Sequence, residues 1–244
     1  MYYLDKERMK IIEELRNKGV SEKVVELIST VKREKFLPNG LTHLAYKDLS
    51  IDIGEGQRMT KISTIVYILE KAEIFNEMKV LEIGTGSGYL TALLSLIAKE
   101  VYTVEVSVDF YYRARSILIK NSYKNVFFRL GNGMEGWDNY APFDRIFINA
   151  AVPALPEKII EQLNVGGVVI YPRDYGEQQK FIKGIKRKGY NEIVLKDCYF
   201  VKVRGVAQIG SASGSGPEGR RFNSSRPDDI KGAVCYERNN IFRE

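Results

Sequence analysis

The stretch KVLEIGTGSGYLTALLS, residues 79–95, decides the fold. An apolar run stops at Glu82, three glycines follow at alternate positions (Gly84, Gly86 and Gly88), and a helical pattern starts at once. Glycine lets the backbone approach a ligand closely and adopt positive φ, and the first turn of a helix offers free N–H groups. The stretch therefore predicts a strand, a ligand-binding loop and a helix in succession.

The loop matches neither common phosphate-binding motif. Counted from Gly84, the last glycine of the dinucleotide fingerprint G-x-G-x-x-G falls on Tyr89, and no Gly-Lys-Ser/Thr of a P-loop follows. Glu105 ends the next apolar run 21 positions after Gly84 (105 − 84), about the offset of an acid that binds ribose hydroxyls. A ribose site without a pyrophosphate cradle favours S-adenosylmethionine. The alternative is tight strand–helix packing beside an exposed glutamate.

Strands and helices alternate through the middle of the chain. Continuous apolar runs predict strands at 79–83, 101–105, 125–130, 144–149 and 167–172, and helical periods lie between them at 88–98, 109–121 and 154–163. This alternation predicts an α/β fold with a doubly wound, mostly parallel sheet of Rossmann-like type. Two further strand patterns follow Pro172 with only a short turn between them, so we expect an antiparallel C-terminal strand pair.

The sequence predicts three regions. Residues 1–61 form an N-terminal region with helices up to about residue 36, in which Ser21 is expected to cap the second helix, followed by loop and short strands. Residues 62–204 are expected to be the S-adenosylmethionine-binding domain. Residues 205–244 are rich in glycine, serine and proline and are expected to be flexible or to lie at a subunit contact.

Composition excludes several classes of protein. No apolar run among the 244 residues is long enough to span a bilayer, and the N-terminus lacks the pattern of a signal peptide, so we expect a cytoplasmic protein without a membrane partner. The net charge of +6 comes from scattered lysines and arginines, which favours a solvated surface over a nucleic-acid footprint. Cys198 and Cys235 have no metal-like spacing, and no metal is expected.

Several blocks resemble one known family. VLEIGTGSGY resembles the cofactor motif of class I S-adenosylmethionine-dependent methyltransferases. REKFLP followed by AYKDLSIDIGEGQRMT is similar to the segment ahead of the cofactor domain in protein-L-isoaspartate (D-aspartate) O-methyltransferases. GNGMEGW, PFDRIFINAAVPALP and LNVGGVVIYP resemble that family's later blocks in the same order, from about Arg33 to Val203. The resemblance implies protein repair: methyl transfer to the α-carboxylate of L-isoaspartyl and D-aspartyl residues in damaged proteins, with S-adenosyl-L-homocysteine as product.

The resemblance also implies site residues. Thr60 is expected to be catalytic, because a hydroxyl can hydrogen-bond an oxygen that is about to be methylated without removing its charge; the alternative is a helix cap. A carboxylate acceptor is already ionised at neutral pH, so no strong base is required. The residues expected to bind the cofactor are Glu82, Gly84, Thr85, Gly86, Ser87, Gly88, Glu105, Asn132 and Gly133, and those expected to bind substrate are Gln57, Met59, Ala151, Val152 and Val201.

The chain departs from the family pattern at three places. Arg58 and Lys61 flank Thr60, and the proline usual after it is missing; Asn132 stands where the family has aspartate; and residues 200–203 replace a family FVPL. The first two departures support one alternative, a catalytically altered cofactor-binding protein. The other alternative is a tRNA adenine-N1 methyltransferase. A homo-oligomer is compatible with the sequence.

Overall fold

The computed structural model describes residues 2–200 and 202–203. Two helices, α1 (Tyr2–Asn17) and α2 (Glu22–Thr30), open the chain, and the 3-10 turns η1 (Arg33–Phe36) and η2 (Asn39–Leu44) follow. Ser21 occupies the N-cap of α2, but its side chain makes no capping hydrogen bond. Its hydroxyl donates instead to Glu70 of the later helix α3. The predicted capping hydrogen bond of Ser21 is therefore wrong, because its hydroxyl bonds to Glu70, a residue distant in the sequence.

A seven-stranded sheet forms the centre of the molecule, in the order β5-β4-β3-β6-β7-β8-β9. The strands from β3 to β7 pair in parallel, whereas β8 and β9 add an antiparallel pair at one edge. This arrangement confirms the predicted fold class. The bounds are β3 (Lys79–Ile83), β4 (Glu100–Glu105), β5 (Val126–Leu130), β6 (Phe143–Ile148), β7 (Leu163–Asp174), β8 (Gln179–Lys186) and β9 (Tyr190–Cys198).

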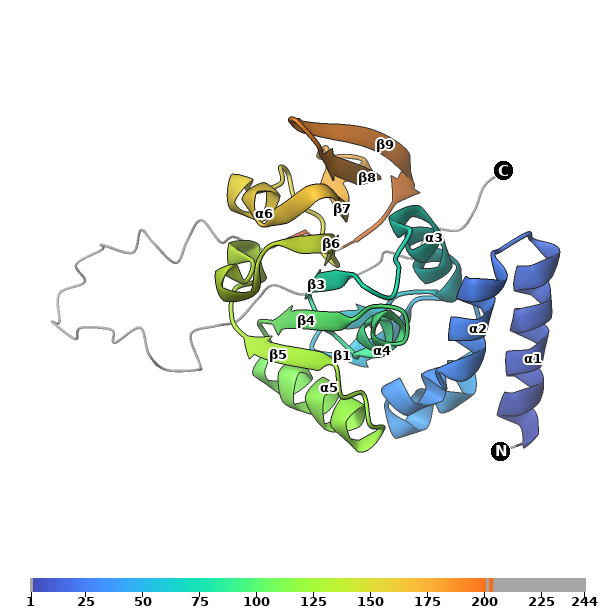
Figure 1. The fold of residues 1–244 in the computed structure, drawn as a ribbon. Coiled ribbons are helices and arrows are strands. Elements are labelled where there is room, and N and C mark those ends of the chain that lie inside the picture. Colours follow the sequence, from blue (N-terminus) through green and yellow to red (C-terminus); the bar gives the residue numbers. More distant parts are fainter. Residues whose placement is uncertain (1, 201, 204–244) are drawn as a thin grey trace, which may run out of the picture.

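Helices cover both faces of the sheet. Figure 1 shows α3 (Ile62–Ala72) and α4 (Tyr89–Ser95) on one side and α6 (Glu157–Glu161) on the other. Neighbouring strand residues point to opposite faces, so Val80 belongs to one buried cluster and Leu81 to the other. The remaining covering elements are α5 (Val108–Lys120), η3 (Gly133–Glu135) and η4 (Asp138–Tyr140). The two cores explain the continuous apolar strands in the sequence.

The C-terminal half differs from the prediction in element length. The helix expected over 154–163 is only α6, five residues long, which begins after Pro156. Proline has no N–H to donate and fits only the start of a helix. The strand expected over 167–172 extends over the whole of β7, because Leu163 pairs with β6 and Asp174 pairs with β8.

The N-terminal region packs against the helices that cover the sheet, through α2 on α3 and η1 on α5. One continuous buried cluster contains Val25, Phe36 and Met59 from this region together with Val80 and Leu93 from the sheet and α4. A separate two-stranded hairpin, β1 (Ile51–Gly54) and β2 (Gln57–Met59), follows η2. The role assigned to residues 205–244 lies outside the described residues.

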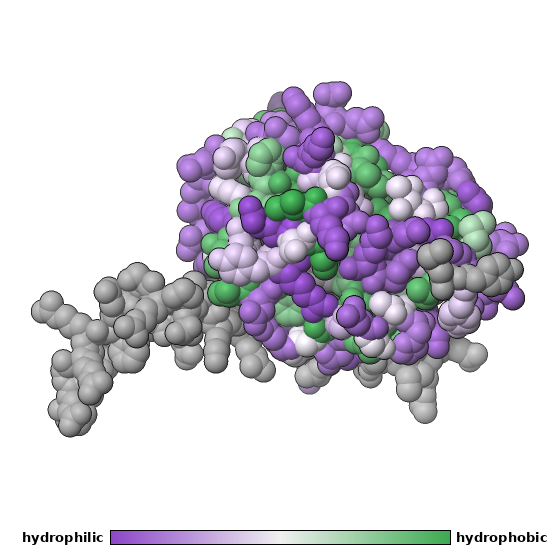
Figure 2. Space-filling model, turned by 90° about the horizontal axis from the view of Figure 1, so that it is seen from below, coloured by the Kyte–Doolittle hydropathy of each residue, from purple (hydrophilic) through white to green (hydrophobic). Residues whose placement is uncertain are grey.

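The described residues show no large hydrophobic patch on the face seen in Figure 2. The face in Figure 2 is mostly hydrophilic, and its hydrophobic side chains lie in small groups. In the part of the chain that the structure describes, no helix has the length and apolar character needed to cross a membrane.

Candidate functional site

The glycine loop follows β3 at the carboxyl edge of the parallel strands. Gly84 N donates to Val104 O at 2.8 Å, which anchors the loop to the neighbouring strand β4. Gly84, Gly86 and Gly88 have φ values of 92°, 52° and 83°, in the left-handed region that glycine tolerates. A side chain at Gly88 would also place its Cβ 3.2 Å from the Cβ of Ala114 in α5. The fold therefore requires glycine at this turn.

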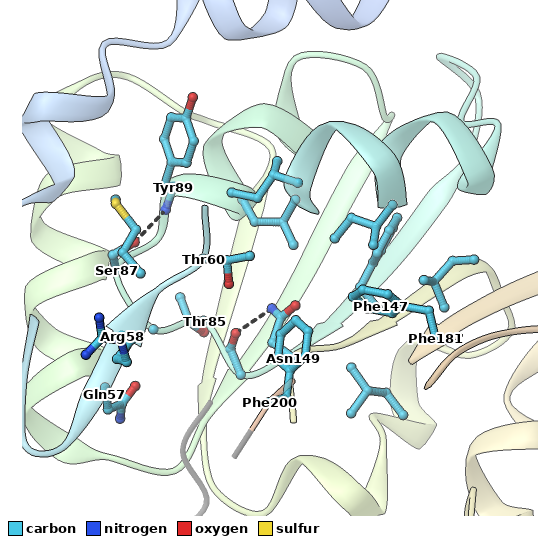
Figure 3. A pocket seen from close by; sticks show the side chains of 18 residues that line it. Gln57, Arg58, Thr60, Thr85, Ser87, Tyr89, Phe147, Asn149, Phe181 and Phe200 are labelled. Atoms are coloured by element: carbon cyan, nitrogen blue, oxygen red, sulfur yellow. Dashed lines mark hydrogen bonds between the residues drawn. The ribbon is translucent and has the colours of Figure 1, made fainter. Parts of the chain in front are cut away.

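Two cavities flank this loop and share Gly84. The first lies between β2 and the glycine loop, and Figure 3 shows its polar side chains at one end and its phenyl rings at the other. Gln57, Arg58, Met59, Thr60, Thr85, Gly86, Ser87, Asn149, Phe147, Phe181 and Phe200 are among its lining residues. The second cavity is lined by Ile83, Gly84, Val104, Val106, Asn132, Gly133, Met134, Ala150 and Val203. Gly84 lines both cavities, so the two meet at the glycine loop.

Glu105 lies at the end of β4 and holds the loop. Its Oε2 accepts from Gly86 N at 2.8 Å, and its Oε1 accepts from Val106 N at 2.9 Å and Ser107 N at 3.0 Å. Burial raises the pKa of this carboxyl, and the three backbone donors oppose the rise. Only 2% of the residue is exposed. Like Glu82, Glu105 is not among the residues that line either cavity, and the contacts that the structure shows for it hold the loop.

Glu82 is fully buried under the loop and is not among the lining residues of either cavity. Its Oε2 accepts from Thr91 Oγ1 at 2.6 Å and from Thr103 Oγ1 at 2.8 Å. A hydroxyl has one proton, so Thr85 must be the donor in its 2.6 Å contact with Thr103. Burial raises the pKa of Glu82 to about 7. The carboxyl is therefore linked to the ligand loop through two threonine hydroxyls.

Asn149 extends this network from β6. Its Nδ2 donates to Gly84 O at 2.8 Å and to Glu82 Oε1 at 3.3 Å. The sequence prediction missed this residue, although its place directly after an apolar strand was a usable signal. Asn149 thus connects the glycine loop, the buried Glu82 and strand β6 through hydrogen bonds.

Asn132 and Gly133 lie in the second cavity, as the sequence predicted for neighbours of a cofactor. Asn132 Oδ1 accepts from Met134 N at 3.0 Å, which starts the 3-10 turn η3. A Cβ on Gly133 would lie 2.3 Å from Ile83 Cγ2, so only glycine fits there. The cavity wall is otherwise mostly apolar, which suits a flat ring system.

Thr60 lines the first cavity and lies between β2 and α3. The fully buried Arg33 donates to Thr60 O at 2.8 Å and to Ala45 O at 2.9 Å, which fixes the backbone of this position. The N-cap of α3 is Lys61, without a side-chain capping bond, and Asp48 Oδ1 instead accepts from Ser63 N at 2.8 Å. The capping alternative for Thr60 is therefore wrong.

The residues predicted to bind substrate separate into two groups. Gln57 and Met59 line the first cavity. Ala151 and Val152 are buried and form isolated bridges with Lys202 and Arg173, and neither is among the residues that line the two cavities. Val201 lies outside the described residues. The phenyl rings of Phe147, Phe181 and Phe200 were missed, because they reach the cavity through long-range strand pairing.

The residues present fit an adenosyl ligand with an amino-acid arm. Gln57 is 2% exposed, and its Nε2 is buried without a hydrogen-bond partner in the described part of the chain. A buried donor without a partner costs about 1–3 kcal/mol, so a polar ligand atom in this cavity would satisfy it. The glycine cradle and the mostly apolar second cavity supply room for the remainder of such a ligand.

Comparisons with known proteins point to one family. A family model described as protein-L-isoaspartate(D-aspartate) O-methyltransferase matches residues 6–208. A protein-L-isoaspartate O-methyltransferase of Dictyoglomus thermophilum is 38% identical over 185 residues, which cover 75% of this chain and 84% of that protein.

Solved structures give the same result. A protein-L-isoaspartate O-methyltransferase superposes with a TM-score of 0.74 at 27% identity, covering 81% of this chain and 66%, just under two thirds, of that one. A putative protein-L-isoaspartate O-methyltransferase from Plasmodium falciparum, in complex with S-adenosyl-L-homocysteine, has a TM-score of 0.72 at 20% identity and covers 79% and 96% of the two chains; at that identity it supports the fold alone. On the family match and the 38% identical relative, the chain belongs to the protein-L-isoaspartate (D-aspartate) O-methyltransferase family.

Proposed function

We propose that the protein transfers a methyl group from S-adenosyl-L-methionine to the α-carboxylate of L-isoaspartyl and D-aspartyl residues in damaged proteins. The family match over residues 6–208 carries this proposal, and the cavity that joins the glycine loop to Thr60 supports it. The same match disfavours the tRNA adenine-N1 alternative. Cytoplasmic location, the absence of a nucleic-acid partner, the division at residue 61 and a homo-oligomer stay predictions.

The cofactor would be held by both cavities, and when bound it supplies the methyl group. Asn132 and Gly133 would face the adenine, and Thr85, Gly86 and Ser87 the amino-acid arm. Glu105 lines neither cavity, and its ribose contact is proposed from its place at the end of β4. Glu82 has its oxygens occupied by protein donors, so its proposed role is to support the loop from below. Ala151, Val152 and Val201 remain proposed substrate contacts on the family resemblance alone.

The residues of the first cavity would act on the acceptor by placement and environment. None of the described residues that line it is acidic, so its wall does not repel an incoming carboxylate. Phe147, Phe181 and Phe200 exclude water, which strengthens the attraction between the anionic acceptor and the cationic methyl donor. Thr60 would orient the acceptor oxygen through its hydroxyl. No proton has to be removed, because the acceptor is already ionised.

Thr60→Ala tests this assignment, with Thr60→Ser as the matched control that keeps the hydroxyl. We expect Thr60→Ala to lower kcat on an isoaspartyl peptide on the order of 10²-fold, the usual effect of losing one transition-state hydrogen bond. Binding of S-adenosyl-L-homocysteine, measured by calorimetry, should be unchanged, and Thr60→Ser should retain most of the activity. An alanine variant with normal turnover would contradict the catalytic role.

A further inference from the structure

The first cavity has one charged residue in its wall. Among the described residues that line it, Arg58 alone carries a charge, and the others are polar or apolar. The reaction proposed for this cavity consumes an anion, the acceptor carboxylate. A single fixed cation in such a wall is therefore placed to act on substrate rather than on the fold.

Arg58 is held by neutral acceptors. Its Nε donates to Ser50 Oγ at 3.2 Å and its Nη2 donates to Ser50 O. Asp52 stands opposite Arg58 in the β1–β2 pairing, yet Asp52 Oδ1 accepts from Gly54 N at 2.9 Å. None of the ion pairs in the described part of the chain includes Arg58. The guanidinium is thus positioned without a carboxylate to neutralise it.

Arg58 lines the same cavity as Thr60, the residue proposed to orient the acceptor. Neighbouring side chains of a strand point to opposite faces, so Arg58 and Gln57 lie on opposite faces of β2. Gln57 lies on the other face, where its Oε1 is 3.9 Å from the position that a Cβ on Gly86 would occupy. Gln57 therefore faces the cofactor loop, and Arg58 accompanies the residue proposed to orient the acceptor.

We infer that Arg58 binds the acceptor carboxylate of the substrate and selects carboxylate over carboxamide. The inference rests on the proposed function. A guanidinium is opposite in charge to a carboxylate, and its planar N–H donors fit the two carboxylate oxygens. Methylation turns the anion into a neutral ester, so the same residue that retains the substrate binds the product more weakly. Arg58 is thus a specificity residue that also assists product release.

Steady-state kinetics on the full-length protein test this inference. An isoaspartyl peptide is the substrate, and the same peptide with a carboxamide in place of the α-carboxylate is the competitive inhibitor. Arg58→Met removes the charge at similar length, and Arg58→Lys keeps it. Ser50→Ala is the control for the contact between Ser50 and Arg58, because it removes one of the two acceptors that hold the guanidinium.

We expect Arg58→Met to raise KM about tenfold, the effect of losing one partly exposed charged hydrogen-bond pair. The preference of the wild type for the peptide over its carboxamide analogue should disappear in this variant, while Arg58→Lys keeps most of it. The Kd for S-adenosyl-L-homocysteine should stay at the wild-type value in both Arg58 variants, and Ser50→Ala should raise KM less than Arg58→Met.

Each contrary outcome has one meaning. A wild-type KM and preference in Arg58→Met would overturn the inference alone, since turnover would still support the proposed function. Weaker cofactor binding with an unchanged peptide KM would assign Arg58 to the cofactor and overturn it too. If Tm falls equally in Arg58→Met and Arg58→Lys and the preference for carboxylate is intact, Arg58 has only a structural role in the β1–β2 hairpin and the inference is overturned. A wild-type protein that does not methylate the isoaspartyl peptide would refute the proposed function itself.

Discussion

Replacing Glu82 by glutamine should remove a large part of the pH dependence of stability. The carboxyl is fully buried, and burial raises its pKa from 4.5 to about 7, although Thr91, Thr103 and Asn149 donate hydrogen bonds that favour the ionised form. Glutamine has nearly the same shape and does not titrate. The side-chain NH₂ of the glutamine would face Asn149 Nδ2, so two hydrogen-bond donors would meet without an acceptor. We therefore expect the variant to be less stable at all pH values.

The sign and size of the effect follow from the two pKa values. Because the pKa is higher in the folded protein than the ordinary 4.5, the folded state binds more protons between about pH 4.5 and pH 7. The free energy of unfolding therefore falls as the pH rises through this window and levels off above it. The full shift corresponds to about 3 kcal/mol, most of which lies between pH 5 and pH 8.

Urea unfolding at pH 5 and pH 8 measures this effect. The free energy of unfolding of the wild type minus that of Glu82→Gln should be about 2–3 kcal/mol smaller at pH 8 than at pH 5. Glu77→Gln, at an exposed position, controls for the change in net charge. If the difference between wild type and Glu82→Gln is the same at both pH values, Glu82 does not titrate in this window and the reasoning fails.

Two further substitutions test the second cavity and the support of Thr60. Gly133→Ala should weaken binding of S-adenosyl-L-homocysteine about 5- to 150-fold, or about 1–3 kcal/mol, because the new Cβ would lie 2.3 Å from Ile83 Cγ2. Calorimetry measures the Kd, and an unchanged Kd would contradict the site. Arg33→Ala should lower the free energy of unfolding by about 3 kcal/mol and reduce kcat as well, since the bond to Thr60 O is lost. Urea unfolding and turnover check both effects, and wild-type turnover in a destabilised variant would refute the positioning role of Arg33.

The sheet was predictable from the sequence because its signals are local. Continuous apolar runs mark strands that are buried on both faces, and bare glycines at Gly84, Gly86 and Gly88 mark a turn that only glycine can form. These signals placed the cofactor loop at the carboxyl edge of the sheet, and the structure confirms the fold.

The errors concern features that depend on distant partners. Ser21 and Thr60 both had the sequence context of helix caps, yet Glu70 takes the hydroxyl of one, and Asp48 caps the helix after the other. Phe181 reaches the first cavity because β8 pairs with β7, and Phe200 is held beside it because its backbone N donates to Gln179 Oε1 of β8. Nothing within a few residues of any of these positions encodes the partner, so sequence pattern alone could not supply it.

The most direct measurement incubates the protein with methyl-labelled S-adenosylmethionine and matched peptides that contain aspartate or isoaspartate, with tRNA in a parallel reaction. The account predicts base-labile label in the isoaspartyl peptide alone, as expected of a methyl ester. Label in tRNA, or no label in any acceptor from a protein that still binds the cofactor, would contradict it.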